Sequence, residues 1–278
     1  MKKVFAITAV ITAFTLCAIE PGMYEKNKEF KRDGVSLTKF EKTVIFPNGA
    51  KINYTILRDS SGKAVAEKWG DFLFGLDFGT PKGSSGGWNR WNIVNVNILR
   101  AKKLKDIVSS SLDKIIYKDG ILTGELDGAS LSIRSSEEFP NFLFVRIVWS
   151  PENKDNPYFI RFNSYPGATK FIGARFIFDG ENSYEMKKGV NAPQESNMFL
   201  VSNKGAFEKS GNIIIWSEKY YNITAKMWDA MVTFDFYPKA GSKTFNYALG
   251  FFNGEDPENV IEKLDGGMKE KILGFMVK

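Results

Sequence analysis

The sequence predicts an all-β fold, a large two-sheet antiparallel sandwich with a short C-terminal helix. Aromatic residues make up 14% of the 278 residues, and aromatic and β-branched side chains suit a pleated, half-buried surface. Short apolar runs recur between turn sequences such as Asn-Gly and Asp-Gly, a pattern typical of sandwiches and barrels. Strands do not alternate with helices, which disfavours Rossmann and TIM-barrel architectures.

Residues 1–18 are expected to be an export signal. Lys2 and Lys3 form a positive start, and the apolar stretch that follows is shorter than the roughly 20 residues of a transmembrane helix. We prefer cleavage near Cys17 to lipidation of that cysteine, because Leu16 is a poor residue before a lipidated cysteine. A buried N-terminal strand is the third interpretation. The mature chain is expected in the periplasm or outside the cell, without a transmembrane span.

The β pattern is expected to follow a flexible, polar N-terminal arm over residues 19–34 and to run from 35 to 255 as a single domain. Pro47-Asn48-Gly49 predicts a hairpin turn, because Asn-Gly tolerates positive φ. Asp119-Gly120 and Asp127-Gly128 predict two more turns, so the strands around them should form a meander.

Residues 256–278 are expected to form a C-terminal helical segment. Asp256 suits the N-cap and Pro257 the first helical position. The helix should end at Gly266-Gly267, with a second short helical piece possible after it. Its apolar side should pack on the sandwich through Val260, Ile261 and Leu264.

The residues that are missing exclude several kinds of site. The sequence contains no histidine, so a Ser-His-Asp triad, a Cys-His pair and a histidine-based zinc site are excluded. Cys17 is the single cysteine, which excludes an intrachain disulfide and cysteine-rich metal sites. We therefore expect no metal and no cofactor. The net charge is +6, and cleavage of the signal with Lys2 and Lys3 would leave 36 − 32 = +4. An ordinary solvated surface is the simplest interpretation of that charge. The alternative is a weak preference for polyanions, which for an exported protein are acidic glycans or envelope surfaces rather than nucleic acid.

Several central strands carry polar residues between aromatic ones. Period-two alternation places Arg146 on one face with Phe142 and Phe144, and Asp235 on the face opposite Phe234. A solvated outer face is the simplest interpretation, but such a face needs no phenylalanine. The alternative is a wet ligand groove, for which the predicted lining residues are Arg146, Arg161, Arg175 and Asp235.

Tryptophans next to these strands could supply stacking surfaces for a sugar. A pyranose has apolar C–H faces that suit aromatic rings and a hydroxyl rim that suits Asn, Asp and Arg. The further ligand-binding candidates are Trp88, Arg90, Trp91 and Trp216. The alternative for Trp88 and Trp91 is a plug at one end of the sandwich core. In the first case Trp91→Ala should weaken glycan binding, and in the second it should lower stability.

The order of segments resembles exported bacterial proteins with a galactose-mutarotase-like β-supersandwich. The segments that carry the resemblance are "FPNGAKINYTI", "GGWNRWN", "YKDGILTGEL", "NSYPG" and "FNYALGFFNGEDPENVIEKL", and it covers most of residues 35–265. The resemblance implies the supersandwich fold and a carbohydrate context. Sugar epimerases of this fold use a histidine acid opposite a carboxylate base, and this chain has no histidine to supply.

Three classes of function follow from these observations. The first is an exported protein that binds a neutral or anionic glycan without catalysis. The second is a glycan-active enzyme, either a lyase or a carboxylate-pair glycoside hydrolase; the latter needs two carboxylates about 5 to 9.5 Å apart, for which the candidates are Asp235 with Glu218 or Asp229. The third is a structural envelope or assembly protein.

Overall fold

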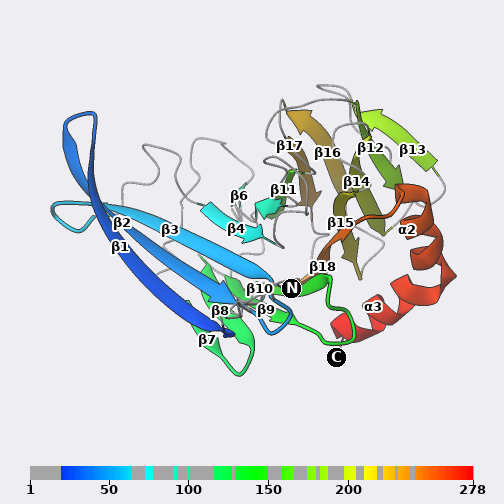
Figure 1. Cartoon of the computed structure of the whole chain (residues 1–278), viewed down its shortest axis with the longest axis horizontal. Coiled ribbons are helices and arrows are strands. Elements are labelled where there is room, and N and C mark those ends of the chain that lie inside the picture. The colour runs from blue at the N-terminus through cyan, green and yellow to red at the C-terminus, as the bar shows by residue number, and fades with distance from the viewer. Residues whose placement is uncertain are drawn as a thin grey trace, which may run out of the picture.

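The chain folds into two facing antiparallel sheets and a C-terminal helical segment, as Figure 1 shows. This confirms the predicted all-β sandwich. The computed structural model describes residues 20–63, 73–77, 90–92, 99–100, 115–126, 129–149, 158–165, 174–179, 182–186, 197–204, 210–217, 222–228, 231–237 and 242–277. The predicted signal peptide lies outside these residues. Among them, no helix is both long and apolar enough to cross a membrane.

The first sheet has nine strands within the described residues. Their spatial order is β1 (Gly22–Arg32), β2 (Val35–Ile45), β3 (Lys51–Asp59), β4 (Leu73–Asp77), β5 (Arg90–Asn92), β11 (Tyr158–Tyr165), β17 (Met231–Tyr237) and β16 (Asn222–Trp228), with β6 (Leu99–Arg100) also paired to β11. Strands that lie far apart in the sequence thus meet at the β5–β11 and β11–β17 pairings.

The second sheet also has nine described strands. Their order is β13 (Asn182–Met186), β12 (Ala174–Asp179), β14 (Met198–Lys204), β15 (Ser210–Trp216), β18 (Thr244–Asn253), β10 (Phe142–Trp149), β9 (Ala129–Ser135), β8 (Ile121–Leu126) and β7 (Ile116–Lys118). The β7–β9 run is the predicted meander, and Asp119 and Gly120 at its first turn have φ of 51° and 75°. The second predicted turn, Asp127-Gly128, lies outside the described residues.

Aromatic side chains fill the core between the sheets. Phe236 of the first sheet contacts Trp216 and Tyr247 of the second, with ring centres 5.3 and 5.1 Å apart. Phe234 contacts Phe199 across the same gap at 5.5 Å. All five side chains are at most 1% exposed. The face of β17 that carries Phe234 and Phe236 is therefore the inner face of the first sheet.

The other face of the second sheet is covered by the C-terminal helices, which Figure 1 draws in red. Helix α2 (Pro257–Lys263) and helix α3 (Lys269–Val277) are joined by the π-helical segment η1 (Leu264–Met268). The backbone leaves helical geometry at Gly266 and Gly267, where φ of Gly267 is 103°. Val260, Ile261 and Leu264 are buried in a cluster with Phe142 and Phe144 of the sheet. The predicted helix, its end and its packing residues are confirmed.

The N-terminal part of the prediction needs a correction, because residues 22–32 form strand β1 rather than a flexible arm. This strand pairs with β2 residue for residue, from Gly22 opposite Ile45 to Arg32 opposite Val35. The turn at Asp33-Gly34 has positive φ at both residues, as the common two-residue hairpin requires. The segment contains few apolar residues, which suggested a loop. A hairpin strand does not need an apolar pattern of its own when a suitable turn brings its backbone into register with the partner strand.

Candidate functional site

The three arginines and the aspartate that were predicted to line one groove belong to two different sheets. Arg161 in β11 and Asp235 in β17 are direct register partners in the first sheet. Arg146 in β10 and Arg175 in β12 belong to the second sheet. Alternation within a strand indicates which residues share a face, but it carries no information on the sheet that the strand joins. The dispersal removes the four-residue groove as support for glycan binding.

Arg146 also differs from the prediction in its surroundings. Its side chain is exposed, whereas Phe142 and Phe144 on the same face lie beneath the C-terminal helices. The ring of Phe144 contacts Phe275 of α3, with centres 4.4 Å apart. The phenylalanines that suggested a ligand face therefore serve to dock a helix, and Arg146 has the solvated position of the simplest interpretation.

Trp216 is a core residue, which corrects its assignment as a ligand contact. It is 1% exposed and packs against Phe199 and Phe236, each with ring centres 5.3 Å away. A side chain enclosed between two sheets has no free face for a sugar. The segment that follows it in the sequence, with Glu218, lies outside the described residues, as do Asp229 and Trp88.

Trp91 and Arg90 lie in β5, where the register assigns their positions to opposite faces. Position 91 pairs with Ser164, and Ser164 pairs on its other side with Val232. Val232 is fully buried and alternates into the same face as Phe234, so position 91 belongs to the inner face. Position 90 belongs to the outer face. The register thus favours the core plug over the groove wall for Trp91.

Polar positions form three rows on the outer face of the first sheet, beside apolar or aromatic positions such as Leu73, Phe159 and Trp228. One continuous row runs through Asn53, Gly75, Asn92, Asn163, Thr233 and Lys226. A second row joins Arg161, Asp235 and Thr224, and a third joins Lys51, Asp77 and Arg90. We call these twelve positions the outer band. The inner rows beside them are almost entirely apolar, for example Phe162, Phe234 and Ala225.

Asp235 is a buried acid within the outer band. Its side chain is 4% exposed, although its position faces away from the core between the sheets. Burying a carboxylate is costly unless it is paired or hydrogen-bonded. Its register neighbours are positions 161 and 224, an arginine and a threonine, which are suitable partner types. This buried acid lies toward the β16 end of the outer band.

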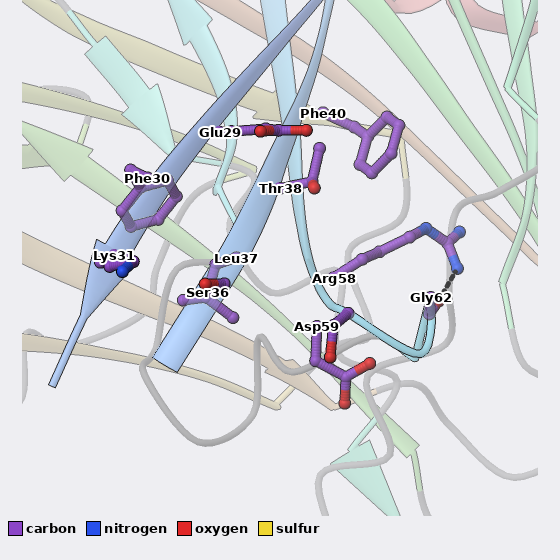
Figure 2. A pocket seen from close by; sticks show the side chains of 11 residues that line it. Glu29, Phe30, Lys31, Ser36, Leu37, Thr38, Phe40, Arg58, Asp59 and Gly62 are labelled. Carbon is purple, nitrogen blue, oxygen red and sulfur yellow. Dashed lines mark hydrogen bonds between the residues drawn. The ribbon is translucent and has the colours of Figure 1, made fainter. Parts of the chain in front are cut away.

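A separate cavity of about 590 Å³ lies where β1 ends, β2 begins and β3 ends, and we call these the turn ends of β1–β3. Its centre is a cross-strand row in which Glu29 of β1 opposes Thr38 of β2, and Thr38 opposes Arg58 of β3. Phe40 and Ser36 flank this row on the same face of β2. Figure 2 shows the Arg58 side chain extending past the Phe40 ring toward the turn at Gly62. The sequence pattern did not predict this site, because residues 19–34 were expected to form a flexible arm rather than a strand.

The turn after β3 fixes the polar groups at one end of the cavity. Arg58 donates a hydrogen bond from Nη1 to the Gly62 carbonyl oxygen at 2.9 Å, and its guanidinium carbon lies 5.8 Å from the centre of the Phe40 ring. Asp59 accepts hydrogen bonds from the Ser61 hydroxyl and from the Ser61 and Lys63 backbone N–H groups at 2.6, 2.9 and 3.0 Å. The Ser61 hydroxyl bond is the main cause that holds the pKa of the Asp59 carboxyl below its usual value.

Comparison with known proteins assigns no family to this chain. No protein-family model matches it, and no curated protein matches it significantly. Within the described residues, no group of three or more Cys, Asp or Glu side chains is arranged to hold a metal ion. The chemistry of the site therefore has to be argued from the outer band and the cavity themselves.

Proposed function

We propose that this chain is an exported carbohydrate-binding protein without catalytic activity, and that a glycan binds over the outer band. The observation that carries the proposal is the continuous polar row from Asn53 through Asn163 to Lys226. A solvated face also tolerates polar residues. Solvation does not account for a buried acid such as Asp235, which is 4% exposed. Export is supported by the N-terminal sequence pattern alone.

The chemistry of the outer band suits a chain of hydroxyl groups. Asn, Asp, Thr and Arg supply both hydrogen-bond donors and acceptors, and amide groups at positions 92 and 163 are direct register partners. Neighbouring strands lie about 4.8 Å apart, so a row across six strands extends on the order of 24 Å. That length suits an extended oligosaccharide rather than a single sugar. The two large sheets are also what the supersandwich resemblance leads one to expect.

The absence of catalysis is proposed from the residue types that the chain can offer. No histidine is present anywhere in the sequence, so a proton transfer near neutral pH would need a carboxylate, lysine or tyrosine with a strongly shifted pKa. The carboxylate pair considered above needs Glu218 or Asp229 as the partner of Asp235, and both partners lie outside the described residues. A reducing-sugar release assay on any glycan that binds tests this part of the proposal.

The binding test uses the purified mature chain on a glycan array, followed by calorimetry with the best oligosaccharide. Arg161→Ala removes the arginine next to Asp235 and should weaken binding about tenfold or more, the scale of a lost charge-assisted hydrogen bond. Arg146→Ala is the matched control, because that arginine is exposed and lies in the other sheet. Equal losses in the two variants, or no glycan binding by the wild type, would show that the outer band is not a glycan site.

A further inference from the structure

We propose that the cavity at the turn ends of β1–β3 is a second binding site, and that its ligand is a sugar acid. The Glu29–Thr38–Arg58 row of the cavity lies on the inner-face side of the first sheet, because Arg58 alternates with Asp59 and shares its face with Ile52. It is therefore separate from the outer band and does not depend on it. Figure 1 shows these strand ends projecting beyond the described strands of the second sheet.

The central row presents three kinds of polar group in direct register. Glu29 supplies a carboxylate, Thr38 a hydroxyl and Arg58 a guanidinium. A guanidinium binds a carboxylate through two parallel hydrogen bonds, and a carboxylate accepts hydrogen bonds from hydroxyl groups. A ligand that satisfies the row carries a carboxylate at the Arg58 end and hydroxyl groups at the Thr38 and Glu29 end.

Arg58 is held in place before any ligand arrives. Its bond to the Gly62 carbonyl oxygen and its position over the Phe40 ring restrict a side chain that otherwise has many rotamers. A guanidinium has five N–H donors, so a ligand carboxylate can join the partners that Arg58 already has. Restricting the side chain beforehand lowers the entropy cost of binding. Figure 2 shows this arrangement, with the Arg58–Gly62 bond drawn as a dashed line.

The neighbouring acid does not compete for this role. The carboxylate of Asp59 is directed into its own turn, where Ser61 and Lys63 donate to it. The side chain of Glu29, by contrast, is exposed and lines the cavity. Glu29 is therefore placed to accept hydrogen bonds from ligand hydroxyl groups, next to Lys31 on the same face.

The apolar part of the wall completes the recognition. Phe40 lines the cavity on the same face as Thr38 and is half-buried, so it offers ring surface to the C–H face of a sugar. The volume of about 590 Å³ falls within the range of small-ligand pockets. A neutral sugar would offer no carboxylate to the guanidinium of Arg58, and acetate would offer no hydroxyl groups to Thr38 and Glu29 and no C–H face to the Phe40 ring. A sugar acid offers a carboxylate, hydroxyl groups and a C–H face together.

The test compares D-galacturonate, its methyl ester and D-galactose on the full mature chain, by titration followed in ¹H–¹⁵N spectra. We expect galacturonate to shift amide signals of residues 29–40 and 58–62. The methyl ester and galactose should bind about tenfold more weakly or worse, because each lacks the charge that Arg58 recognises. Equal binding of the acid and its ester would overturn the proposal, as would shifts confined to other residues.

Variants test the same point from the protein side. Arg58→Gln should weaken galacturonate binding about tenfold, whereas Arg146→Gln, the same change at an exposed arginine of the second sheet, should not. Should Arg58→Gln fail to fold, Arg58→Lys keeps the charge and loses the two-pronged geometry, and the acid–ester comparison on the wild type stands independently. Arg161→Ala should leave galacturonate binding at the cavity unchanged, which separates this proposal from the one on the outer band.

Discussion

Arg134 of β9 holds Phe275 of α3 in two ways at once. Its Nη2 donates a hydrogen bond to the Phe275 carbonyl oxygen at 2.9 Å, and its guanidinium carbon lies 4.5 Å from the centre of the Phe275 ring. The same ring also contacts Phe144 and Phe139, at 4.4 and 5.8 Å between centres. A residue near the C-terminus is thus fastened to the second sheet by polar, cation–π and aromatic contacts together.

Arg134→Ala should lower the free energy of unfolding by about 1–3 kcal/mol, because it removes a charge-assisted hydrogen bond and a cation–π contact. Urea denaturation measures this, and hydrogen exchange should speed up most in residues 269–277. Arg146→Ala on the same face of that sheet is the control and should change stability by less than about 0.5 kcal/mol. Equal effects of the two substitutions would contradict the role given to Arg134.

Two strand glycines are required by close packing. A Cβ at Gly250 would lie 2.5 Å from the Phe142 ring, and one at Gly211 would overlap the Val201 carbonyl oxygen. Each alanine substitution should cost about 1–3 kcal/mol, with Gly211→Ala the more harmful because a backbone oxygen cannot rotate away. Gly274→Ala in α3 is the control: no atom lies within 4 Å, so alanine should add about 0.5–1 kcal/mol of stability. Thermal denaturation of the three variants checks this order.

The Asp59 turn should respond to acid in a defined direction. The Ser61 hydroxyl bond lowers the pKa of the folded-state carboxyl below 3.8, so the ionised form stabilises the turn at a pH above the unfolded-state pKa. That contribution is lost as the pH falls through the folded-state pKa. In an NMR titration the Asp59 carboxyl should have its midpoint below 3.8, and Ser61→Ala should move that midpoint upward. An unchanged midpoint in the variant would rule out Ser61 as the main cause.

Trp91→Ala is expected to affect stability more than binding. The position belongs to the inner face of the first sheet, in one row with Ser164 and the fully buried Val232. Emptying a buried tryptophan site costs about 3–5 kcal/mol, which calorimetric melting would detect. A variant that melts like the wild type but binds glycan poorly would instead assign Trp91 to the groove wall.

The candidate sites were predicted less well than the fold, for one physical reason. In the sequence, Arg146 and Arg161 each stand between apolar residues of a strand, so the local pattern is the same for both arginines. Register pairing then places Arg161 beside Asp235 in the first sheet, and Arg146 in the second sheet next to the helix-covered phenylalanines. Which strands become neighbours depends on contacts between residues far apart in the sequence.

The sequence by itself determined the local features. Turn residues that accept positive φ, such as Gly49 and Gly120, predicted hairpins that the structure contains. Pro257 begins the helical segment, and Gly267 interrupts it before α3. These features depend on interactions within a few residues, so a local pattern is enough to predict them. The β1 strand was missed because its stability comes from pairing with β2 rather than from an apolar pattern of its own. The outer band, the cavity and the Arg134–Phe275 contact were decided by tertiary structure alone, because each requires strands or helices that only folding brings together.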